Sequence, residues 1–301
     1  MNKTIKIEIE EIIDIKKIFK DYHKIKIENS QNVQLNQYDL KGLKIGKSIL
    51  KDDENQLNIQ VVEKHTLSAN FEISYERFSN KNVLVIGDSV SAQATIGNDK
   101  TYSTLLSEAL NFNTLHNCAI GGTTLTYMYE TSNIYKEYHD NLNIKDGCMM
   151  IKELKENQKL ANIDYVFIAY GHNDQYFKVA IDEENTTNIN SLSQIHSFKN
   201  SYRYIINELK KANPNIRIII LNCTYSEYDI ASKSPYGTQF TYQDYRNASQ
   251  QIAKEYQLKY IDPWEYMKQF CDYKTNNHYY KDSVHISKNG HYELFKFLLQ
   301  Q

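Results

Sequence analysis

Four short polar motifs of this sequence contain the residue types that catalyse acyl transfer, and they follow one another along the chain. The motifs are Gly87-Asp88-Ser89, Asn117-Cys-Ala-Ile-Gly121-Gly122, Gly171-His172-Asn173-Asp174 and Asp282-Ser-Val-His285. A serine hydroxyl is a weak nucleophile, so it needs a base that is itself oriented by a third group. Ser89 can be the nucleophile, His285 the base and Asp282 the group that orients it.

Acyl transfer also needs hydrogen-bond donors aimed at the negative charge that develops on the carbonyl oxygen. The backbone N–H groups of Ser89 and Gly122 and the side-chain amide of Asn173 can supply three. Glycine suits position 122, because a bare backbone can approach the reacting carbon closely. Gly121 is the alternative donor, but Gly122 fits the spacing after Asn117 better. The sequence therefore predicts an oxyanion hole made by Ser89, Gly122 and Asn173.

The four motifs resemble the four diagnostic blocks of the SGNH (GDSL) hydrolase family, in order and over residues 83–290. Ser89 matches the family's nucleophile, Gly122 and Asn173 its second-block and third-block residues, and Asp282 and His285 its Asp-x-x-His pair. The resemblance implies a serine esterase with a flavodoxin-like, three-layer α/β/α parallel sheet. It implies no cofactor and no metal.

One residue departs from the family pattern, and a second serine-hydrolase fold is disfavoured. Ile286 follows the histidine where the family often has proline, which changes how the loop is braced but not the base. An α/β-hydrolase needs Gly-x-Ser-x-Gly at its nucleophile. Ser89 is followed by Val90 and Ser91, and no other serine has flanking glycines.

From residue 83 onward, short apolar runs alternate with segments whose apolar residues recur at helical spacing. Strands are predicted at 83–86, 115–120, 165–170, 217–222 and 259–262, and helices at 102–110, 195–209, 244–257 and 289–299. Asn213-Pro214 should stop the second helix, since the residue before a proline avoids helical angles. Strands that alternate with helices predict a parallel sheet covered on both faces, with ligands at the carboxyl ends of the strands. The fold can therefore gather the motifs at one edge.

Residues 1–80 are predicted to form a small β-rich accessory domain, ahead of a catalytic domain at 81–301. Short alternating segments at 4–10, 23–28, 56–62 and 70–75 indicate strands, with Gly42 and Gly46 in turns. Residues 12–19 could instead form one short helix. The accessory domain contains no catalytic cluster, so its role is either packing or substrate binding.

Composition excludes several classes of protein. The net charge of −2 comes without a basic block, so the sequence lacks the electrostatic footprint of a nucleic-acid binder. No apolar run is long enough to span a membrane. The first residues place carboxylates where a secretory signal needs an apolar run. The sequence thus predicts a cytoplasmic protein, provided that no leader was removed from it.

Cysteine and glycine usage narrows the chemistry further. The four cysteines lie far apart without a Cys-x-x-Cys pair, which predicts buried free thiols, with two disulfides in an exported form as the alternative. No histidine spacing indicates a metal site. Glycine makes up only 10 of 301 residues, about 3%, against ~7% in a typical protein. Because glycine is this scarce, each one is expected to hold a backbone shape that a Cβ would prevent.

Several of the motif residues also have purely structural explanations. Ser89 could cap a helix, Asn173 could be a buried turn residue and His285 a surface histidine. Asp88 is expected to hold the turn at Ser89 through bonds to loop amides. His172, His278 and His291 are expected to be structural or to line the pocket.

The expected substrate is a small-molecule or carbohydrate ester with a short acyl group, most simply acetyl. Polar and aromatic residues follow the motifs at Thr123, Thr124, Tyr127, Tyr129, Tyr176 and Phe177 and within 225–242. Such side chains suit a cleft that stacks on sugar rings, although core and surface filling explains most of them. The alternatives are a polysaccharide O-acetyltransferase with the same site, a lysophospholipase or thioesterase, and a binding module with a vestigial site.

Overall fold

A computed structural model describes residues 78–128, 136–137, 145–182, 192, 195–227 and 240–301, together with the backbone of seven strands within residues 2–62. Contacts within the chain divide it into two units, Met1–Ile73 and Ser74–Gln301. The division lies a few residues before the boundary predicted between residues 80 and 81. That the two units fold as separate domains remains a prediction.

The Met1–Ile73 unit is β-structured, with a four-stranded sheet of order β1-β7-β6-β3 and a three-stranded sheet of order β2-β5-β4. The strands are β1 (Asn2–Glu8), β2 (Ile12–Asp14), β3 (Lys26–Glu28), β4 (Val33–Asn36), β5 (Asp39–Gly42), β6 (Gly46–Lys51) and β7 (Gln56–Val62). Three predicted segments overlap β1, β3 and β7, and the fourth, 70–75, lies outside the described residues. Residues 12–14 form a strand rather than the start of a helix, and 15–19 lie outside the described residues.

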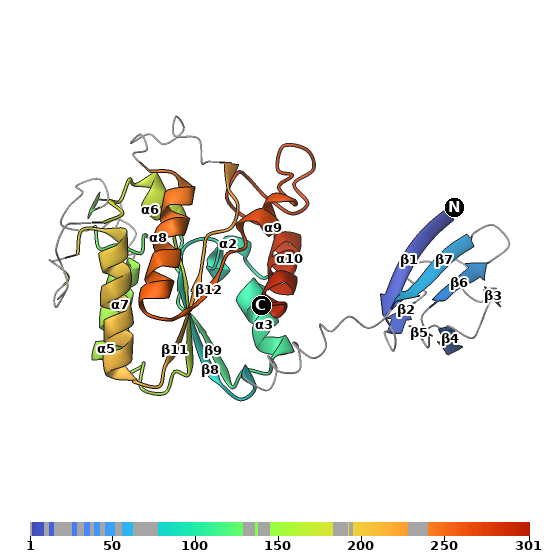
Figure 1. The fold of residues 1–301 in the computed structure, drawn as a ribbon, viewed down its shortest axis with the longest axis horizontal. Helices are drawn as coiled ribbons and strands as arrows, with labels where there is room; N and C mark the ends of the chain where they lie inside the picture. The colour runs from blue at the N-terminus through green and yellow to red at the C-terminus, as the bar shows by residue number, and fades with distance from the viewer. Residues whose placement is uncertain are drawn as a thin grey trace. The chain divides into compact units, whose positions relative to one another are not determined.

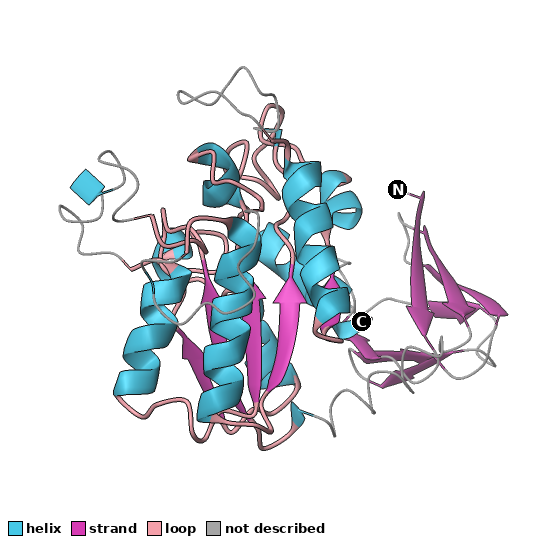
Figure 2. Cartoon of the chain, turned by 60° about the vertical axis from the view of Figure 1, so that its left-hand side comes forward, coloured by secondary structure: helices cyan, strands magenta, loops and turns pink. Residues whose placement is uncertain are grey.

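The Ser74–Gln301 unit contains a five-stranded sheet in which every paired strand is parallel, as Figure 2 shows. Its order is β12-β11-β10-β8-β9. The first strand along the chain, β8, therefore has β9 on one side and β10 on the other, and β11 and β12 follow beyond β10. The strands are β8 (Asn82–Gly87), β9 (Thr114–Asn117), β10 (Tyr165–Ala169), β11 (Arg217–Leu221) and β12 (Lys259–Ile261). The predicted parallel sheet is confirmed.

Helices cover both faces of this sheet, which completes the predicted three layers (Figure 1). One face carries α3 (Tyr102–Ala109) and α10 (Lys288–Leu299), and the other α5 (Gly147–Glu156), α7 (Phe198–Ala212) and α8 (Tyr242–Glu255). Short helices α2 (Gln93–Ile96), α6 (His172–Tyr176) and α9 (Trp264–Lys268) follow β8, β10 and β12. Helices α3, α7, α8 and α10 lie where they were predicted, and α7 ends directly before Asn213-Pro214.

Burial explains both the strands that were predicted and the helix that was missed. Residues 83–86 of β8 are at most 1% exposed, because a strand between two helical layers needs apolar side chains on both faces. Helix α5 was not predicted, although Cys148, Ile151 and Leu154 form a buried stripe three residues apart. The side chain of Asp146 caps this helix by accepting the N–H of Met149. The capping aspartate and the apolar stripe are both visible in the sequence and could have predicted this helix.

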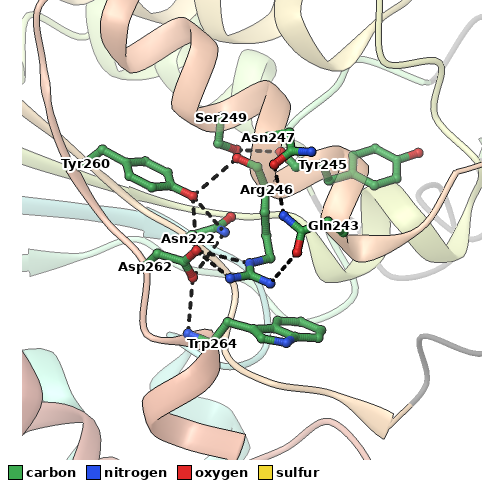
Figure 3. Close-up of polar contacts among 9 residues, drawn as sticks. All are labelled: Asn222, Gln243, Tyr245, Arg246, Asn247, Ser249, Tyr260, Asp262 and Trp264. Atoms are coloured by element: carbon green, nitrogen blue, oxygen red, sulfur yellow. Dashed lines mark hydrogen bonds and ion pairs between the residues drawn. The ribbon is translucent and has the colours of Figure 1, made fainter.

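A polar junction fixes the ends of β11 and β12 against α8 (Figure 3). The Arg246 guanidinium donates from Nε and Nη2 to Oδ2 of Asp262, at 3.1 and 2.7 Å, and lies over the Trp264 ring with 4.9 Å to the centroid. Asp262 also accepts the Trp264 N–H, and the Asn222 amide donates to the Tyr260 hydroxyl at 3.2 Å. The arginine is nearly buried, and a buried charge needs a partner. The Asp262 carboxylate, which is itself hydrogen-bonded, supplies the opposite charge.

All four cysteines are free thiols, as expected, but only two of them are buried. Cys148 and Cys223 lie in the core, whereas Cys118 and Cys271 are half-buried. The expectation of burial was wrong for Cys118 and Cys271, because they lie in the loops after β9 and α9 rather than in a packed layer. No helix in the described part of the chain is long and apolar enough to cross a membrane.

His291 joins the two helices on one face of the sheet. Its Nδ1 accepts the backbone N–H of Tyr102 at 3.2 Å, and the two rings stack with their centroids 6.1 Å apart. Burial, with a smaller contribution from the Lys281 ammonium, lowers the pKa of His291 to about 3. The imidazole is therefore neutral in the folded protein above about pH 3.

This buried histidine makes stability depend on pH. As the pH falls from 6.5 towards 3, the unfolded chain binds a proton at residue 291 and the folded chain does not. The free energy of unfolding of the wild type should therefore fall by about 1.4 kcal/mol per pH unit relative to His291→Asn, whose amide oxygen can still accept the Tyr102 N–H. Urea denaturation of both proteins at about pH 7.5, 5.5 and 4.5 measures this difference. A difference that stays constant across these pH values would contradict the assignment.

Candidate active site

Ser89 lies in the turn that follows β8, at the carboxyl edge of the sheet. The turn is held by Asp88, whose Oδ1 accepts the N–H of Val90 at 3.0 Å. Asp88 is 1% exposed, so its expected structural role in the turn is confirmed by its contacts. Helix α2 begins at Gln93 with Ala92 at its cap position, so Ser89 does not cap it.

The structure brings Ser89, His285 and Asp282 into one hydrogen-bonded line. His285 Nε2 lies 2.9 Å from Ser89 Oγ, and His285 Nδ1 lies 2.8 Å from Asp282 Oδ2. A carboxylate accepts, so Nδ1 carries the ring proton and Nε2 is left to accept from the serine hydroxyl. This is the arrangement that a serine nucleophile and its base require.

Asp282 is kept ionised by its own loop. Partial burial raises the pKa of its carboxyl, but hydrogen bonds from the His285 N–H, the Val284 N–H and the imidazole outweigh this effect and lower it. Oδ1 accepts the two backbone N–H groups at 2.7 and 2.8 Å, which leaves Oδ2 for the ring. A negative charge therefore faces the imidazole and favours its protonated form when the serine loses its proton.

Asp272 organises the segment that leads to this loop. Its carboxylate accepts the backbone N–H groups of His278, Tyr279 and Tyr280, at 3.0 to 3.3 Å. The Tyr280 hydroxyl then donates to the Tyr225 carbonyl at 3.1 Å. No sequence motif singled out Asp272, because its partners are backbone groups that have no residue-type signature.

Ile286 braces the loop in place of the proline that the family often has. It is 1% exposed and bridges Tyr280 in antiparallel fashion, while the Lys281 N–H donates to the His285 carbonyl at 2.8 Å. Gly290 at the start of α10 packs directly against it: a Cβ there would lie 2.7 Å from Ile286 Cβ and would overlap the Tyr279 carbonyl oxygen. The position therefore accepts no side chain without a backbone shift.

The second motif is tied to the nucleophile turn by hydrogen bonds. The Asn117 side-chain amide donates to the Ser91 carbonyl at 2.8 Å, and the Ile120 N–H donates to the Gly87 carbonyl at 3.0 Å. These bonds run between segments about 30 positions apart. They hold the loop after β9 beside the loop after β8.

The glycine pair lies next to Ser89. A Cβ built on Gly121 would lie 3.6 Å from Ser89 Cβ, and Gly122 has φ of 79°, a left-handed conformation that favours glycine. Neither the Ser89 N–H nor the Gly122 N–H donates a hydrogen bond within the described residues. Both are available to a ligand, and their role as oxyanion donors remains a prediction.

Asn173 and Asp174 of the third motif hold the segment that follows the second motif. The Asn173 amide donates to the Thr123 carbonyl at 2.9 Å. Asp174 is buried and accepts the N–H groups of Leu125 and Thr126 and the Thr126 hydroxyl. Burial raises the pKa of Asp174 to about 7, against the opposing effect of these bonds. The bond to the Thr123 carbonyl uses one hydrogen of the Asn173 amide, and the other hydrogen is the candidate oxyanion donor.

Most of the polar and aromatic side chains that follow the motifs contribute to packing, as expected for the majority of them. Thr123, Thr124 and Tyr127 are buried, and the half-buried rings of Tyr176 and Phe177 pack edge to face at 5.2 Å. Tyr129 and residues 228–239 lie outside the described residues. Of the three other histidines that the sequence analysis named, His172 and His291 are buried and His278 is exposed. No group of side chains in the described part of the chain could hold a metal ion.

Fold and site together define a three-layer α/β protein with a Ser-His-Asp line at the carboxyl edge of its sheet. The model of the GDSL-like lipase/acylhydrolase family matches residues 85–292, and the chain belongs to this family. The resemblance seen in the four motifs is thereby confirmed, and with it a family of esterase-type and lipase-type hydrolases.

Solved structures show the same fold at low sequence identity. A protein from Lactobacillus plantarum is 16% identical with a TM-score of 0.55, and the match covers 73% of this chain and 95% of that one. A possible lipase from Chitinophaga pinensis is 16% identical with a TM-score of 0.50, covering 72% and 96%. No curated protein matches the chain in sequence.

Gly290→Ala should lower the free energy of unfolding by about 1–3 kcal/mol, because the added methyl overpacks against Ile286 and a backbone carbonyl. Urea denaturation measures the change. The control is Lys288→Ala, an exposed position in the same helical turn, which should stay within about 0.5 kcal/mol of the wild type. Equal stabilities for the two variants would show that the loop is not packed as described.

Proposed function

We propose that this protein is a serine esterase that removes short acyl groups, most simply acetyl, from a carbohydrate through an acyl-enzyme. The observation that carries the proposal is the line from Ser89 through His285 to Asp282, with hydrogen bonds of 2.9 and 2.8 Å. Family membership supports ester hydrolysis as the class of reaction.

The reaction runs in two halves that use the same groups. Ser89 Oγ attacks the ester carbonyl while His285 Nε2 takes its proton, and the protonated ring then gives that proton to the departing alkoxide. Asp282 stabilises the imidazolium and keeps Nδ1 protonated throughout. Water then attacks the acyl-serine with the same base, which releases the carboxylic acid and returns the proton to Ser89.

Both tetrahedral intermediates carry a negative oxygen that needs donors. The Ser89 and Gly122 N–H groups and the second amide hydrogen of Asn173 are proposed to supply them. Removing one such donor typically costs about 10² to 10³ in rate. The hydrogen bond from Asn173 to the Thr123 carbonyl supports this role, because it orients the amide and ties it to the glycine loop.

The polar character of the site supports a carbohydrate ester. The side chains of His285 and Asp282 are 33% and 53% exposed, so the acid–base pair meets water. A hydroxyl-rich substrate replaces that water with hydrogen bonds of its own. A long acyl chain would instead need an extended apolar surface beside the serine.

Ser89→Ala should reduce kcat for p-nitrophenyl acetate by at least about 10³-fold, because the nucleophile is lost. The matched control is Ser107→Ala, on the half-buried side of α3, which should retain full activity. A fluorophosphonate probe should label the wild type and the control but not Ser89→Ala. Full activity in Ser89→Ala would refute the mechanism, and an unlabelled wild type would favour a binding module with a vestigial site.

A chain-length series of p-nitrophenyl esters tests the substrate class. The value of kcat/KM should be highest for acetyl and fall with longer chains. A maximum at long chains would instead indicate a lysophospholipase or thioesterase. Incubation with an acetyl donor and an unacetylated glycan separates the remaining alternative, since an O-acetyltransferase would form acetylated glycan where an esterase forms acetate.

A further inference from the structure

A second carboxylate–imidazole pair lies buried beside the nucleophile. Asp88 Oδ2 lies 3.4 Å from His172 Nδ1, and the two side chains are 2% and 4% exposed. Oδ1 of the same carboxylate holds the Val90 N–H, but Oδ2 accepts no hydrogen bond within the described residues. The imidazole is a group able to satisfy this buried oxygen, and a small approach would complete the bond.

Both ring nitrogens of His172 face oxygen atoms. Nε2 lies 3.0 Å from the Thr224 carbonyl oxygen, which can only accept, so Nε2 carries a proton. Nδ1 faces the Asp88 carboxylate, which also accepts when it is ionised. A neutral imidazole has one N–H and cannot serve both oxygens. An imidazolium can donate to both.

The charges around the pair favour a cation at His172. A buried carboxylate without a partner is costly, and no Lys or Arg of the described residues lies within ion-pair distance of Asp88. The other titratable groups that feel its charge are Asp174, Cys223 and the hydroxyls of Tyr102 and Tyr202, all of them neutral or negative. Among the described residues, His172 is the group within ion-pair distance of Asp88 that can supply a positive charge.

The position of His172 connects three strand ends of the site. Asp88 directly precedes Ser89 after β8, and His172 directly precedes Asn173 after β10. Thr224 follows β11 and is next to Tyr225, whose carbonyl accepts the Tyr280 hydroxyl of the Asp282 loop. The Tyr242 ring packs edge-on against the imidazole with the centroids 5.6 Å apart, so the imidazole is held on that side as well.

We propose that Asp88 and His172 form a buried carboxylate–imidazolium pair that positions Ser89 and Asn173 relative to each other. The two are positioning residues, since they act through their chain neighbours and do not touch the substrate. The proposal deepens the proposed esterase function and depends on it for its effect on catalysis. The pair itself can be tested without any substrate.

Histidine NMR tests the charge state directly. In protein labelled with ¹⁵N-histidine at about pH 7.5, both ring nitrogens of His172 should carry protons, with the signals assigned by their loss in His172→Gln. In Asp88→Asn one of the two protons should be lost. A singly protonated His172 in the wild type would overturn the proposal, and would assign Asp88 Oδ2 to a water in the adjacent cavity of about 10 Å³.

A double-mutant cycle tests the positioning role. Asp88→Asn keeps an oxygen for the Val90 N–H, and His172→Gln keeps a donor for the Thr224 carbonyl. Each should lower kcat for p-nitrophenyl acetate by about 10- to 100-fold, with KM within about 3-fold, because the reacting groups shift while binding persists. The double variant should be no worse than either single one, since both break the same pair.

The control is His116→Gln, an exposed histidine on the edge strand β9, which should leave kcat unchanged. Losses that multiply in the double variant, or variants that lose thermal stability with kcat unchanged, would overturn the positioning role. The NMR result on the wild type needs only His172→Gln to fold, since that variant assigns the signals, and it does not depend on activity. If Ser89→Ala keeps full activity while the wild-type imidazole is doubly protonated, the esterase mechanism fails and the buried pair does not.

Discussion

The hydrogen bond between His285 and Ser89 joins two segments 196 positions apart, and the rest of the unit is organised around making it. A proton can transfer between these atoms only if they stay within about 3 Å. That demand explains why the Asp272 carboxylate holds the backbone of residues 278–280 just before the loop at 282–285, and why Ile286 packs on Gly290 just after it. The catalytic side chains are therefore held by residues that take no part in the chemistry themselves.

The parallel arrangement of the strands brings the motifs together. Because β8, β9 and β10 run in the same direction, their carboxyl ends bring three motifs to one edge. The loops there bond to each other, as the Ile120–Gly87 and Asn173–Thr123 contacts show. The proposed oxyanion donors thus lie in a hydrogen-bonded layer of loops at the carboxyl edge of the parallel sheet.

Buried charge in this layer is handled in two ways. Asp174 accepts three hydrogen bonds, yet burial still raises its pKa to about 7, so it is only partly ionised at physiological pH. Arg246 and Asp262 instead neutralise each other with good geometry at the ends of β11 and β12. Asp88 has fewer hydrogen bonds than Asp174 and no guanidinium, which leaves His172 as its partner.

The amino-acid sequence predicted the parallel sheet, four of its main helices and the members of the Ser-His-Asp line, because apolar periodicity and motif spacing are local properties of the chain. It missed α5, and it overestimated the burial of Cys118 and Cys271. The groups that hold the site could be identified only from the fold: Asp272, the Ile286–Gly290 contact and the Asp88–His172 pair. These depend on backbone acceptors and on neighbours far apart along the chain, and such contacts exist only once the chain has folded.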